Sequence, residues 1–461
     1  MKFLEYLSSI KGKRVFVVGA GISNSPLIEA LLDAGVDVTV CDKRLREELG
    51  EASGRFERAG ARLQLGDGYL EKLDADIIFR TPGLMPWNPS LQAAVANGAA
   101  LSSEMEAFFD VCPCKIIGVT GSDGKTTTTS IIGELLRNAG KTVHVGGNIG
   151  APLLCNADSM SSDDIVVLEL SSFQLISMRK SPHIAVVTNI SPNHLDVHRD
   201  MDEYVDAKRN IFAHQKSTDK AVFNLDNAYT RKYQKTAPGE TAFFSSSGYP
   251  EDGVFLSDGT IFDVRGGQRA AIMEARDILL PGLHNVENFM AAFAALQGLV
   301  SNDVMRETAR NFRSVPHRIE FVREFEGVRY YNDSIASSPT RTIAGLLSFD
   351  KKVILIAGGK RKGVAFDELG KMIVKRVKSL ILTGMTAEEI HNAVVSSPEF
   401  DGEPEIQIHS EFKDAVEAAS RLAKEGDSVL LSPACTSFDM FRNFEERGDT
   451  FKGLVLGLGN G

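Results

Sequence analysis

The amino-acid sequence predicts an α/β fold with mostly parallel sheets, divided into about three domains. Short β-branched runs alternate along the chain with glycine-rich turns and amphipathic stretches, a pattern typical of parallel strands connected by helices. The chain also has 461 residues, which exceeds what one hydrophobic core usually serves. No internal repeat is detectable in the sequence.

Three blocks of the chain are expected to form the domains. The first block, residues 1–112, ends just before the strand-like run KIIGVTG opens a new unit. The second block, residues 113–315, ends after the helical run NVENFMAAFAALQGLV and a smaller helix. The third block, residues 316–461, contains the strand-like runs VRYYND, KVILIAGG, SLILTG and SVLLSP.

Composition and charge exclude several classes of protein. Hydrophobic residues make up 43% and charged residues 24% of the chain, and its 41 glycines follow no period, which excludes collagen-like, disordered and coiled-coil chains. A net charge of -10 argues against a general nucleic-acid binder. The N-terminus lacks the apolar core of a signal peptide, and no uncharged apolar run approaches the ~18 residues of a membrane span. The 5 cysteines are odd in number and show no regular spacing, so they do not suggest a disulfide framework, and a cytoplasmic protein with reduced thiols is expected.

Residues 14–42 of the first block predict a nucleotide-binding βαβ unit. The run RVFVV, the turn at residues 19–24, a helix and the run VTVCD follow one another, and the last run ends at Asp42. Glycines let such a turn approach a diphosphate, and a carboxylate after the second strand can accept hydrogen bonds from a ribose or base. Asn24 stands where a dinucleotide fingerprint has its third glycine, so an oxidoreductase is a remote alternative, and a turn without ligand is another. A rigid turn at residues 81–83 ends a further strand and could add donors to the same crevice.

The strongest signal for chemistry is IIGVTGSDGKTTTTSIIGELL, in which a strand, a glycine-bearing turn and a helix follow one another. Residues 121–127 are interpreted as a phosphate loop, whose backbone N–H groups wrap phosphates while Lys125 offsets their charge. A hydroxyl of Thr126 or Thr127 can reach Mg²⁺. Val119 stands where the standard Walker motif has its first glycine, and a strand-to-helix turn without nucleotide is the alternative.

Two further strands of the second block end in polar residues. The run IVVLELSS contains Glu169 at its end, and a carboxylate there suits Mg²⁺, which prefers oxygen ligands. His194 follows the run IAVVTNIS and could support a second metal, although a lone loop histidine is more often part of the surface. Because ligands collect at the carboxyl ends of parallel strands, we expect both residues near the phosphate loop.

The segments TGSDGKTTT, ELSSFQL, NHLDVH and EYVDAKRNIF together resemble the Mur ligase superfamily. The resemblance runs from Gly19 to Phe444 and implies a Rossmann-like N-terminal domain, a P-loop central ATPase domain with a mostly parallel sheet, and a Rossmann-like C-terminal domain. It also implies ATP as co-substrate, two Mg²⁺ ions, and a carbamate formed from CO₂ on Lys208. Only a free amine attacks CO₂, so this lysine needs a depressed pKa. Taken alone, Lys208 would be interpreted as a solvated helix lysine.

The resemblance further implies residue roles. The residues expected in catalysis are Lys125, Glu169, His194, Lys208 and Arg318. The expected metal ligands are Thr126, Glu169, His194 and Lys208. The residues expected to bind ATP are Gly121, Ser122, Asp123, Gly124, Lys125, Thr126, Thr127, Asn285, Asn288, Arg318 and Asp333. The residues expected to bind the other substrates are Gly21, Ile22, Ser23, Asp42, Lys43, Thr81, Pro82, Gly83, Asn148, Ser171, Lys362, Ser437 and Phe444. Taken alone, Asn285 would be a helix cap, and either Arg318 or Asp333 could belong to an interdomain salt bridge.

The run SPACTSFDMFRNFEERG resembles the D-glutamate-adding branch of that superfamily. It implies addition of D-glutamate to UDP-N-acetylmuramoyl-L-alanine through an acyl phosphate in peptidoglycan precursor synthesis, by a monomer with small-molecule partners, no nucleic acid and no membrane. A DNPR-type motif of the diaminopimelate- or lysine-adding branch is absent from the sequence. A nucleotide switch without ligase activity and a ligase for another amino acid stay open as alternatives. The sequence departs from the common family pattern at Asp123, Asn193, Ile335, Lys360 and Arg361.

Overall fold

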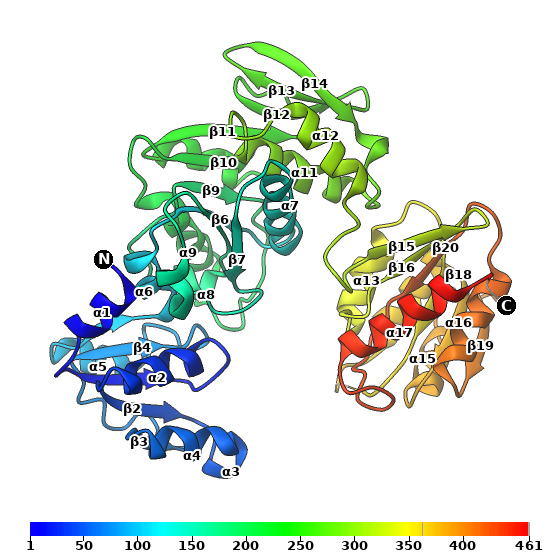
Figure 1. Cartoon of the computed structure of the whole chain (residues 1–461). Helices are drawn as coiled ribbons and strands as arrows, with labels where there is room; N and C mark the ends of the chain where they lie inside the picture. Colours follow the sequence, from blue (N-terminus) through cyan, green and yellow to red (C-terminus); the bar gives the residue numbers. More distant parts are fainter. Residues whose placement is uncertain (362, 460–461) are drawn as a thin grey trace. The chain divides into compact units, whose positions relative to one another are not determined.

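The computed structural model describes residues 1–361 and 363–459, and its strands form three sheets (Figure 1). The chain separates into two compact units: unit 1 contains Met1–Met273 and Glu287–Arg306, and unit 2 contains Glu274–Val286 and Glu307–Gly461. The sheets confirm the predicted α/β class with mostly parallel strands. The domain boundaries at residues 112 and 315 stay predictions.

The first sheet has five parallel strands in the order β3-β2-β1-β4-β5. Its strands are β1 (Arg14–Val18), β2 (Asp37–Asp42), β3 (Arg62–Leu65), β4 (Ile77–Arg80) and β5 (Ala100–Ser102). Its helices are α1 (Phe3–Ser9), α2 (Asn24–Asp33), α3 (Arg46–Leu49), α4 (Glu51–Arg58), α5 (Pro89–Ala96) and α6 (Glu104–Val111). The strand order reverses at β1, so a crevice for a ligand is expected between the carboxyl ends of β1 and β4.

The second sheet has nine strands in the order β14-β13-β12-β11-β10-β9-β6-β8-β7. Its strands are β6 (Lys115–Thr120), β7 (Val143–Gly147), β8 (Ile165–Glu169), β9 (Ile184–Val187), β10 (Lys220–Asn224), β11 (Glu240–Ser245), β12 (Gly253–Ser257), β13 (Thr260–Arg265) and β14 (Gln268–Glu274). The strands from β12 through β7 pair in parallel, and β13 pairs with β12 antiparallel. Every residue of β8 and β9 is buried, as expected for parallel strands covered on both faces.

The helices that follow these strands carry several of the candidate site residues. They are α7 (Lys125–Asn138), α8 (Ser172–Leu175), α9 (Met201–Ala213), α10 (Thr230–Tyr233), α11 (Leu283–Ala295) and α12 (Asn302–Asn311), with short 3₁₀ turns η1 (Leu154–Ser159), η2 (Gln234–Thr236) and η3 (Ala275–Asp277). The first and second sheets share one continuous cluster of buried apolar side chains that includes Leu7 of α1 and Leu168 of β8. In addition, Asp158 accepts hydrogen bonds from the first amides of α1. The two sheets of unit 1 are therefore held in a fixed relation.

The third sheet, in unit 2, has six strands in the order β15-β16-β20-β17-β18-β19. Its strands are β15 (Glu320–Phe325), β16 (Val328–Asn332), β17 (Val353–Ala357), β18 (Val377–Thr383), β19 (Glu405–His409) and β20 (Ser428–Leu431). Only β15 is antiparallel to its neighbour among the described strands of this sheet. Its helices are α13 (Pro339–Leu347), α14 (Asp367–Arg376), α15 (Ala387–Val395), α16 (Phe412–Leu422) and α17 (Phe444–Gly457).

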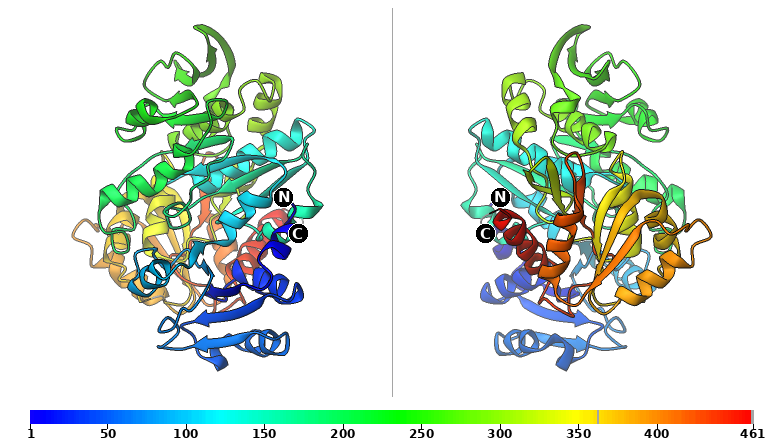
Figure 2. Two further views of the ribbon diagram at one scale, coloured as in Figure 1. Left: turned by 90° about the vertical axis from the view of Figure 1, so that its left-hand side faces the viewer. Right: turned by 90° about the vertical axis from the view of Figure 1, so that its right-hand side faces the viewer.

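Helices cover both faces of the third sheet. Successive residues of β17 face opposite layers: Leu355 packs in a cluster with α14 and α15, and Ile354 packs in one with α16 and α17. The strands of this sheet and the helices around it can be followed in yellow to red in Figures 1 and 2. Among the described residues, no helix is both long and apolar enough to cross a bilayer.

Candidate active site in unit 1 and substrate loops of unit 2

The predicted phosphate loop connects the buried strand β6 to α7. Gly124 has φ +77°, and a Cβ there would overlap the side-chain oxygen of Asn288, while a Cβ at Gly121 would overlap the Thr188 hydroxyl. Both positions therefore require glycine for close packing as well as for backbone conformation. No side chain caps the N-terminus of α7, a 14-residue helix that begins at Lys125. Its first-turn amides are the donors that a helix end offers to an anion.

Asn189 holds the loop in shape, a role that the sequence interpretation missed. Its carbonyl accepts a hydrogen bond from the Ser122 amide, and its side-chain oxygen accepts one from the Asp123 amide, both at 2.9 Å. The Lys125 amine folds back and donates to the carbonyls of Gly121 and Ser122 at 3.0 and 2.8 Å. The loop thus has a defined conformation in the protein alone.

Glu169 connects the phosphate loop to the end of β7. One carboxylate oxygen accepts a hydrogen bond of 2.7 Å from the Thr126 hydroxyl, and the other accepts one of 2.8 Å from the Asn148 amide. The Asn148 backbone amide also donates to the Glu169 carbonyl at 2.8 Å. Glu169 is only 2% exposed. The structure therefore brings three sequence-predicted residues, Thr126, Asn148 and Glu169, into one hydrogen-bonded group.

Lys208 lies on α9 and is 1% exposed, so its interpretation as a solvated helix lysine is wrong. Its amine donates a hydrogen bond of 2.7 Å to the Gly121 carbonyl and lies 4.7 Å from the centre of the Tyr204 ring. Burial, together with the nearby Lys125 charge, lowers the pKa of Lys208 to about 6. At neutral pH this amine is mostly uncharged, as carbamate formation requires.

His194 is exposed and adopts a left-handed backbone with φ 55°. Its ring packs edge-on against Phe173, with ring centroids 5.0 Å apart. Burial of part of the ring, followed by the Lys125 charge, lowers the pKa of His194, which favours the neutral form that binds metals. His198, which sequence reasoning missed, stacks on Phe173 with ring centroids 5.3 Å apart, and its ring forms a hydrogen bond of 2.9 Å with the Ser172 hydroxyl.

Ser171 serves in the structure as the N-cap of α8. Its hydroxyl accepts a hydrogen bond from the Gln174 amide at 3.3 Å, and its own amide donates to the Gln174 side chain at 2.9 Å. This capping box fixes the chain directly after Glu169. A contact between Ser171 and a substrate stays a prediction.

Asp42 organises the turns at the end of the first sheet where a crevice is expected. Its two carboxylate oxygens accept hydrogen bonds from the Ala20 amide at 2.8 Å and from the Arg44 guanidinium at 2.8 and 3.0 Å. Burial tends to raise the pKa of Asp42, but the hydrogen bonds from Arg44 and Ala20 outweigh burial and hold it below its usual value. Asp42 therefore positions the glycine turn, and its contact with a nucleotide stays a prediction. Arg44, which sequence reasoning missed, places a guanidinium at this end of the sheet.

Asn24, which stands where a dinucleotide fingerprint has its third glycine, forms hydrogen bonds that a glycine could not form. Its amide donates to the carbonyls of Val18 and Gly19 at 3.2 and 2.9 Å, so it ties the end of β1 to the turn. Gly19 has φ +88° and packs closely against the Thr81 side chain. Seven of the predicted substrate-binding residues lie on the three turns that follow β1, β2 and β4: Gly21, Ile22, Ser23, Lys43, Thr81, Pro82 and Gly83.

Two asparagines of α11 were expected at the nucleotide base. Asn288 is buried, and its side-chain oxygen accepts a hydrogen bond of 3.2 Å from the Thr128 hydroxyl, which places it beside the phosphate loop in unit 1. Asn285 donates to the Pro281 carbonyl at 2.6 Å. Since α11 begins at Leu283, Asn285 lies inside the first turn, and its interpretation as a helix cap is wrong.

In unit 2, Asp333 follows β16 and is buried. Its carboxyl accepts hydrogen bonds from the Ser432 hydroxyl at 2.7 Å and the Ile319 amide at 3.3 Å. Burial raises the pKa of Asp333 to about 7, although the Arg318 and Arg341 charges oppose this. An interdomain salt bridge of Arg318 or Asp333 stays a prediction.

Two of the residues expected to bind the other substrates, Ser437 and Phe444, lie on the segment between β20 and α17 or at the start of α17 in unit 2. Ser437 is 2% exposed, and its carbonyl accepts the amides of Met440 and Phe441 at 3.1 and 2.8 Å. Phe444 begins α17 and packs edge-on against His317, with ring centroids 5.8 Å apart. Lys362 lies outside the described residues. The backbone of Lys360 pairs with Thr436, so its departure from the family pattern concerns the side chain alone.

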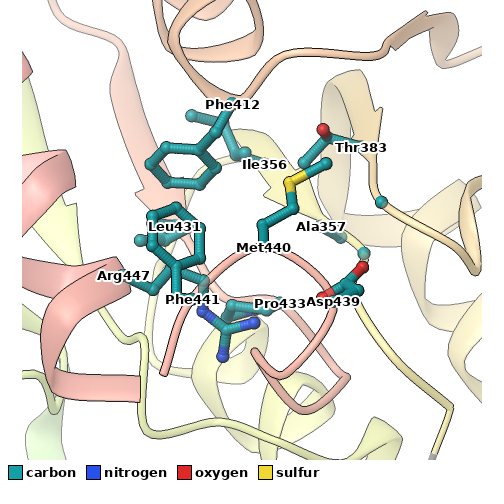
Figure 3. Close-up of a pocket in the computed structure, with 13 residues that line it drawn as sticks. Ile356, Ala357, Thr383, Phe412, Leu431, Pro433, Asp439, Met440, Phe441 and Arg447 are labelled. Carbon is teal, nitrogen blue, oxygen red and sulfur yellow. The ribbon is translucent and has the colours of Figure 1, made fainter. Parts of the chain in front are cut away.

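A small cavity lies beneath the turn at residues 439–441, between side chains that include Phe412, Leu431 and Arg447 (Figure 3). Its volume of about 10 Å³ is room for about one water molecule. Neither Ser437 nor Phe444 lines it. This cavity is therefore not where an amino-acid substrate is expected.

Comparison with known proteins identifies the family. A family model described as the Mur ligase middle domain matches residues 119–296, and one described as the Mur ligase glutamate ligase domain matches residues 317–435. A UDP-N-acetylmuramoylalanine--D-glutamate ligase of Acetivibrio thermocellus is 49% identical over 458 residues, which cover 98% of both chains. A protein of the same name from Ruminiclostridium cellulolyticum is 47% identical over 461 residues, which cover 99% of both chains. The chain belongs to the Mur ligase family.

Solved structures of Mur ligases share the fold. The UDP-N-acetylmuramate-alanine ligase of Thermotoga maritima has a TM-score of 0.55 at 17% identity and covers 96% of this chain and 99% of its own. A MurF ligase of the same organism, in complex with ADP, has a TM-score of 0.53 at 19% identity and covers 98% of this chain and 96% of its own. At such identities the likeness concerns the fold alone.

Mur ligases use ATP and Mg²⁺, and the residues of unit 1 fit this cation. The Glu169 carboxylate and the Thr126 hydroxyl are oxygen donors beside the phosphate loop, and Mg²⁺ is usually held by one or two carboxylates with water and substrate phosphates. Among the described residues, no group of three or more His, Cys, Asp and Glu is arranged to hold a metal.

Proposed function

We propose that this chain catalyses the ATP-dependent addition of D-glutamate to UDP-N-acetylmuramoyl-L-alanine. The observation that supports the proposal is the hydrogen-bonded group of Thr126, Glu169 and Asn148 beside the phosphate loop. The uncharged Lys208 amine donates a hydrogen bond to the Gly121 carbonyl of the same loop. The full-length relatives at 47–49% identity that carry the D-glutamate ligase name support the choice of substrates. The expected cytoplasmic location and monomeric state are predictions from the sequence.

The proposed reaction has two steps. An alanyl carboxylate oxygen attacks the γ-phosphorus of ATP, and ADP leaves, which gives an acyl phosphate. The amine of D-glutamate then attacks the acyl carbon, phosphate leaves, and the nitrogen loses a proton. Bound Mg²⁺ neutralises charge on the transferred phosphoryl group, which is mainly a task of positioning and electrostatics.

The residues of unit 1 have defined tasks in this proposal. The first-turn amides of α7 and the Lys125 amine bind the phosphates, and the Glu169 carboxylate and Thr126 hydroxyl would hold Mg²⁺. The free Lys208 amine attacks CO₂: a nitrogen–carbon bond forms, one C=O π bond of CO₂ opens, and one proton is released, so that an uncharged amine becomes an anionic carbamate that could bind the metal. The turns around Gly19 and Thr81 hold the uridine diphosphate, with Arg44 as the nearby cation.

The residues of unit 2 are proposed to complete the reaction. Arg318 stabilises the transferred phosphoryl group, and Asp333 contacts the nucleotide. Lys362, Ser437 and Phe444 surround D-glutamate. The support for these roles is the resemblance of the motifs that contain them, together with the burial of Asp333 and Ser437 on neighbouring loops.

The decisive experiment measures phosphate release with ATP, Mg²⁺ and UDP-N-acetylmuramoyl-L-alanine against a panel of D- and L-amino acids. We expect release that depends on D-glutamate and on the UDP-sugar together. ADP formation without any amino acid would favour a nucleotide switch. A preference for another amino acid would keep the reaction class and overturn the substrate.

A further inference from the structure

Arg80, the last residue of β4, is a cation buried between two segments of unit 1. It is 1% exposed, and it forms no salt bridge within 4.0 Å among the described residues. Burial lowers the pKa of its guanidinium to about 10, and the charge of Glu106 opposes this effect. Burying a guanidinium among mostly neutral acceptors opposes folding unless its hydrogen bonds are well satisfied. The acceptors around Arg80 therefore indicate what it holds in place.

One side of the guanidinium binds the turn proposed to hold the UDP-sugar. Nη1 donates to the carbonyls of Thr81, Pro82 and Leu84 at 3.4, 3.3 and 3.2 Å. Thr81 in turn packs against Gly19 of the glycine turn, and its amide donates to the Val18 carbonyl at 2.9 Å. The contacts of Arg80 thus reach both turns of the crevice.

The other side of the guanidinium binds the segment that follows Glu169. Nη2 donates to the Phe173 carbonyl and to the Ser177 hydroxyl, both at 2.8 Å, and Nε donates to the same hydroxyl at 3.3 Å. Phe173 belongs to α8, and its ring contacts those of His194 and His198. A shift of this backbone would move both histidine contacts and the chain next to Glu169.

We infer that Arg80 is a positioning residue, which fixes the UDP-sugar turn at residues 81–84 relative to α8 beside the metal-binding carboxylate. This inference rests on the proposed function, because that function assigns the two segments to the acceptor and to the phosphoryl donor. The planar guanidinium presents several donors in a fixed geometry and so can bind both segments at once. A lysine amine, a single point on a flexible stem, cannot reproduce this geometry.

The test compares the steady-state kinetics of the full chain with those of Arg80→Met, Arg80→Lys and Ser177→Ala. For Arg80→Met we expect the KM for the UDP-sugar to rise about tenfold, kcat to fall about tenfold, and the KM for ATP to change less than about twofold. Ser177→Ala removes the two hydrogen bonds from Arg80 to the Ser177 hydroxyl and leaves those to residues 81–84, so kcat should fall while the KM for the UDP-sugar stays unchanged. Arg14→Met is the matched control, because Arg14 lies at the other end of the same sheet and is paired with Asp74 and Asp76.

If Arg80 only stabilised the fold, its substitution would lower the melting temperature and the fraction of active enzyme. The KM for the UDP-sugar would then stay unchanged in the molecules that remain folded. Unchanged kinetic constants in a folded Arg80→Met would overturn the inference. Should Arg80→Met fail to fold, Arg80→Lys decides: a raised KM for the UDP-sugar supports the inference, and an unchanged one overturns it. Lack of D-glutamate-dependent turnover in the unsubstituted protein would instead count against the proposed function.

Discussion

The Lys208 amine donates a hydrogen bond of 2.7 Å to the carbonyl of Gly121, the first residue of the phosphate loop. A buried lysine with a pKa of about 6 is mostly uncharged at pH 7, and so it can react with CO₂. We expect activity to fall when dissolved CO₂ and bicarbonate are removed and to return when bicarbonate is added. Carbon-13 NMR with labelled bicarbonate should show one slowly exchanging carbamate that Lys208→Met lacks. Activity independent of CO₂ would contradict the carbamate.

Lys208 should also affect how stability depends on pH. Its folded pKa lies below the unfolded value, so the unfolded chain binds more protons between about pH 6 and 10. The contribution of Lys208 to the free energy of unfolding therefore rises with pH across this window, by at most about 1.4 kcal/mol per pH unit. Urea unfolding of the protein without bicarbonate at pH 6.5 and 8.5 should show this rise, and Lys208→Met should lack it.

Glu169→Gln keeps the size of the side chain and removes its charge. The Thr126 hydroxyl can still donate to the amide oxygen, so the fold should survive, but Mg²⁺ loses an anionic ligand. We expect the Mg²⁺ concentration for half-maximal phosphate release to rise at least about tenfold. Asn148→Asp is a useful comparison, because it changes the other side of the same hydrogen-bonded group. An unchanged Mg²⁺ dependence in Glu169→Gln would exclude this residue as the metal carboxylate.

Gly124→Ala tests the close packing of the phosphate loop. Gly124 and Gly140 both have φ +77°, but only at Gly124 would a Cβ meet another side chain, that of Asn288. Gly140→Ala should cost about 1 kcal/mol of stability from backbone strain and leave the KM for ATP unchanged. Gly124→Ala should cost more and should raise the KM for ATP. Equal effects of the two substitutions on ATP would contradict the proposed role of the loop.

Asp333 should give unit 2 the opposite pH dependence. Because burial raises its folded pKa to about 7, the carboxyl contributes stability below its unfolded pKa near 4, and this contribution is lost as pH rises toward 7. Asp333→Asn should therefore be more stable than the unsubstituted protein at pH 8 and similar to it at pH 4. Chemical unfolding followed at both values would check this, and an equal difference at both would contradict it.

Arg447 offers a counterpart of Arg80 in unit 2. It is buried, and its guanidinium donates to the Ser334 hydroxyl and carbonyl and to the Cys435 carbonyl at 2.9–3.1 Å. We expect Arg447→Met to raise the KM for D-glutamate about tenfold while the KM for the UDP-sugar stays unchanged. Arg442→Met is the matched control, since Arg442 is an exposed residue paired with Glu446 on the same segment. A raised KM for the UDP-sugar instead would contradict the assignment.

Local patterns predicted the strands and turns that carry the site, because their signals lie within a few residues. The phosphate loop and the position of Glu169 at a strand end follow from such patterns. The burial of Lys208 could not be predicted from its helix alone, since contacts with Gly121 and Tyr204 cause it. The support that Asn189 gives to the loop depends on the pairing of β6 with β9, which no short segment encodes.

Some residues that depart from common motifs form contacts that only the three-dimensional structure reveals. Asn24 stands in place of a glycine because its amide closes the turn after β1. The role of Arg80 could not be predicted from the sequence, because its hydrogen-bond partners Phe173 and Ser177 are far from it along the chain. A spacing of four residues between His194 and His198 was the one local sign of the second histidine.

The shared apolar cluster between the first two sheets has a consequence for protein engineering. A fragment cut near residue 112 would expose to water side chains such as Leu154 and Ala157, which in the intact chain belong to the same cluster as those of α1 and α2. Residues 1–112 are therefore not expected to fold as a stable unit when separated from the rest of unit 1. Replacing residues 1–112 by the corresponding part of another protein would require redesign of the apolar side chains that the first and second sheets share, whatever linker is used.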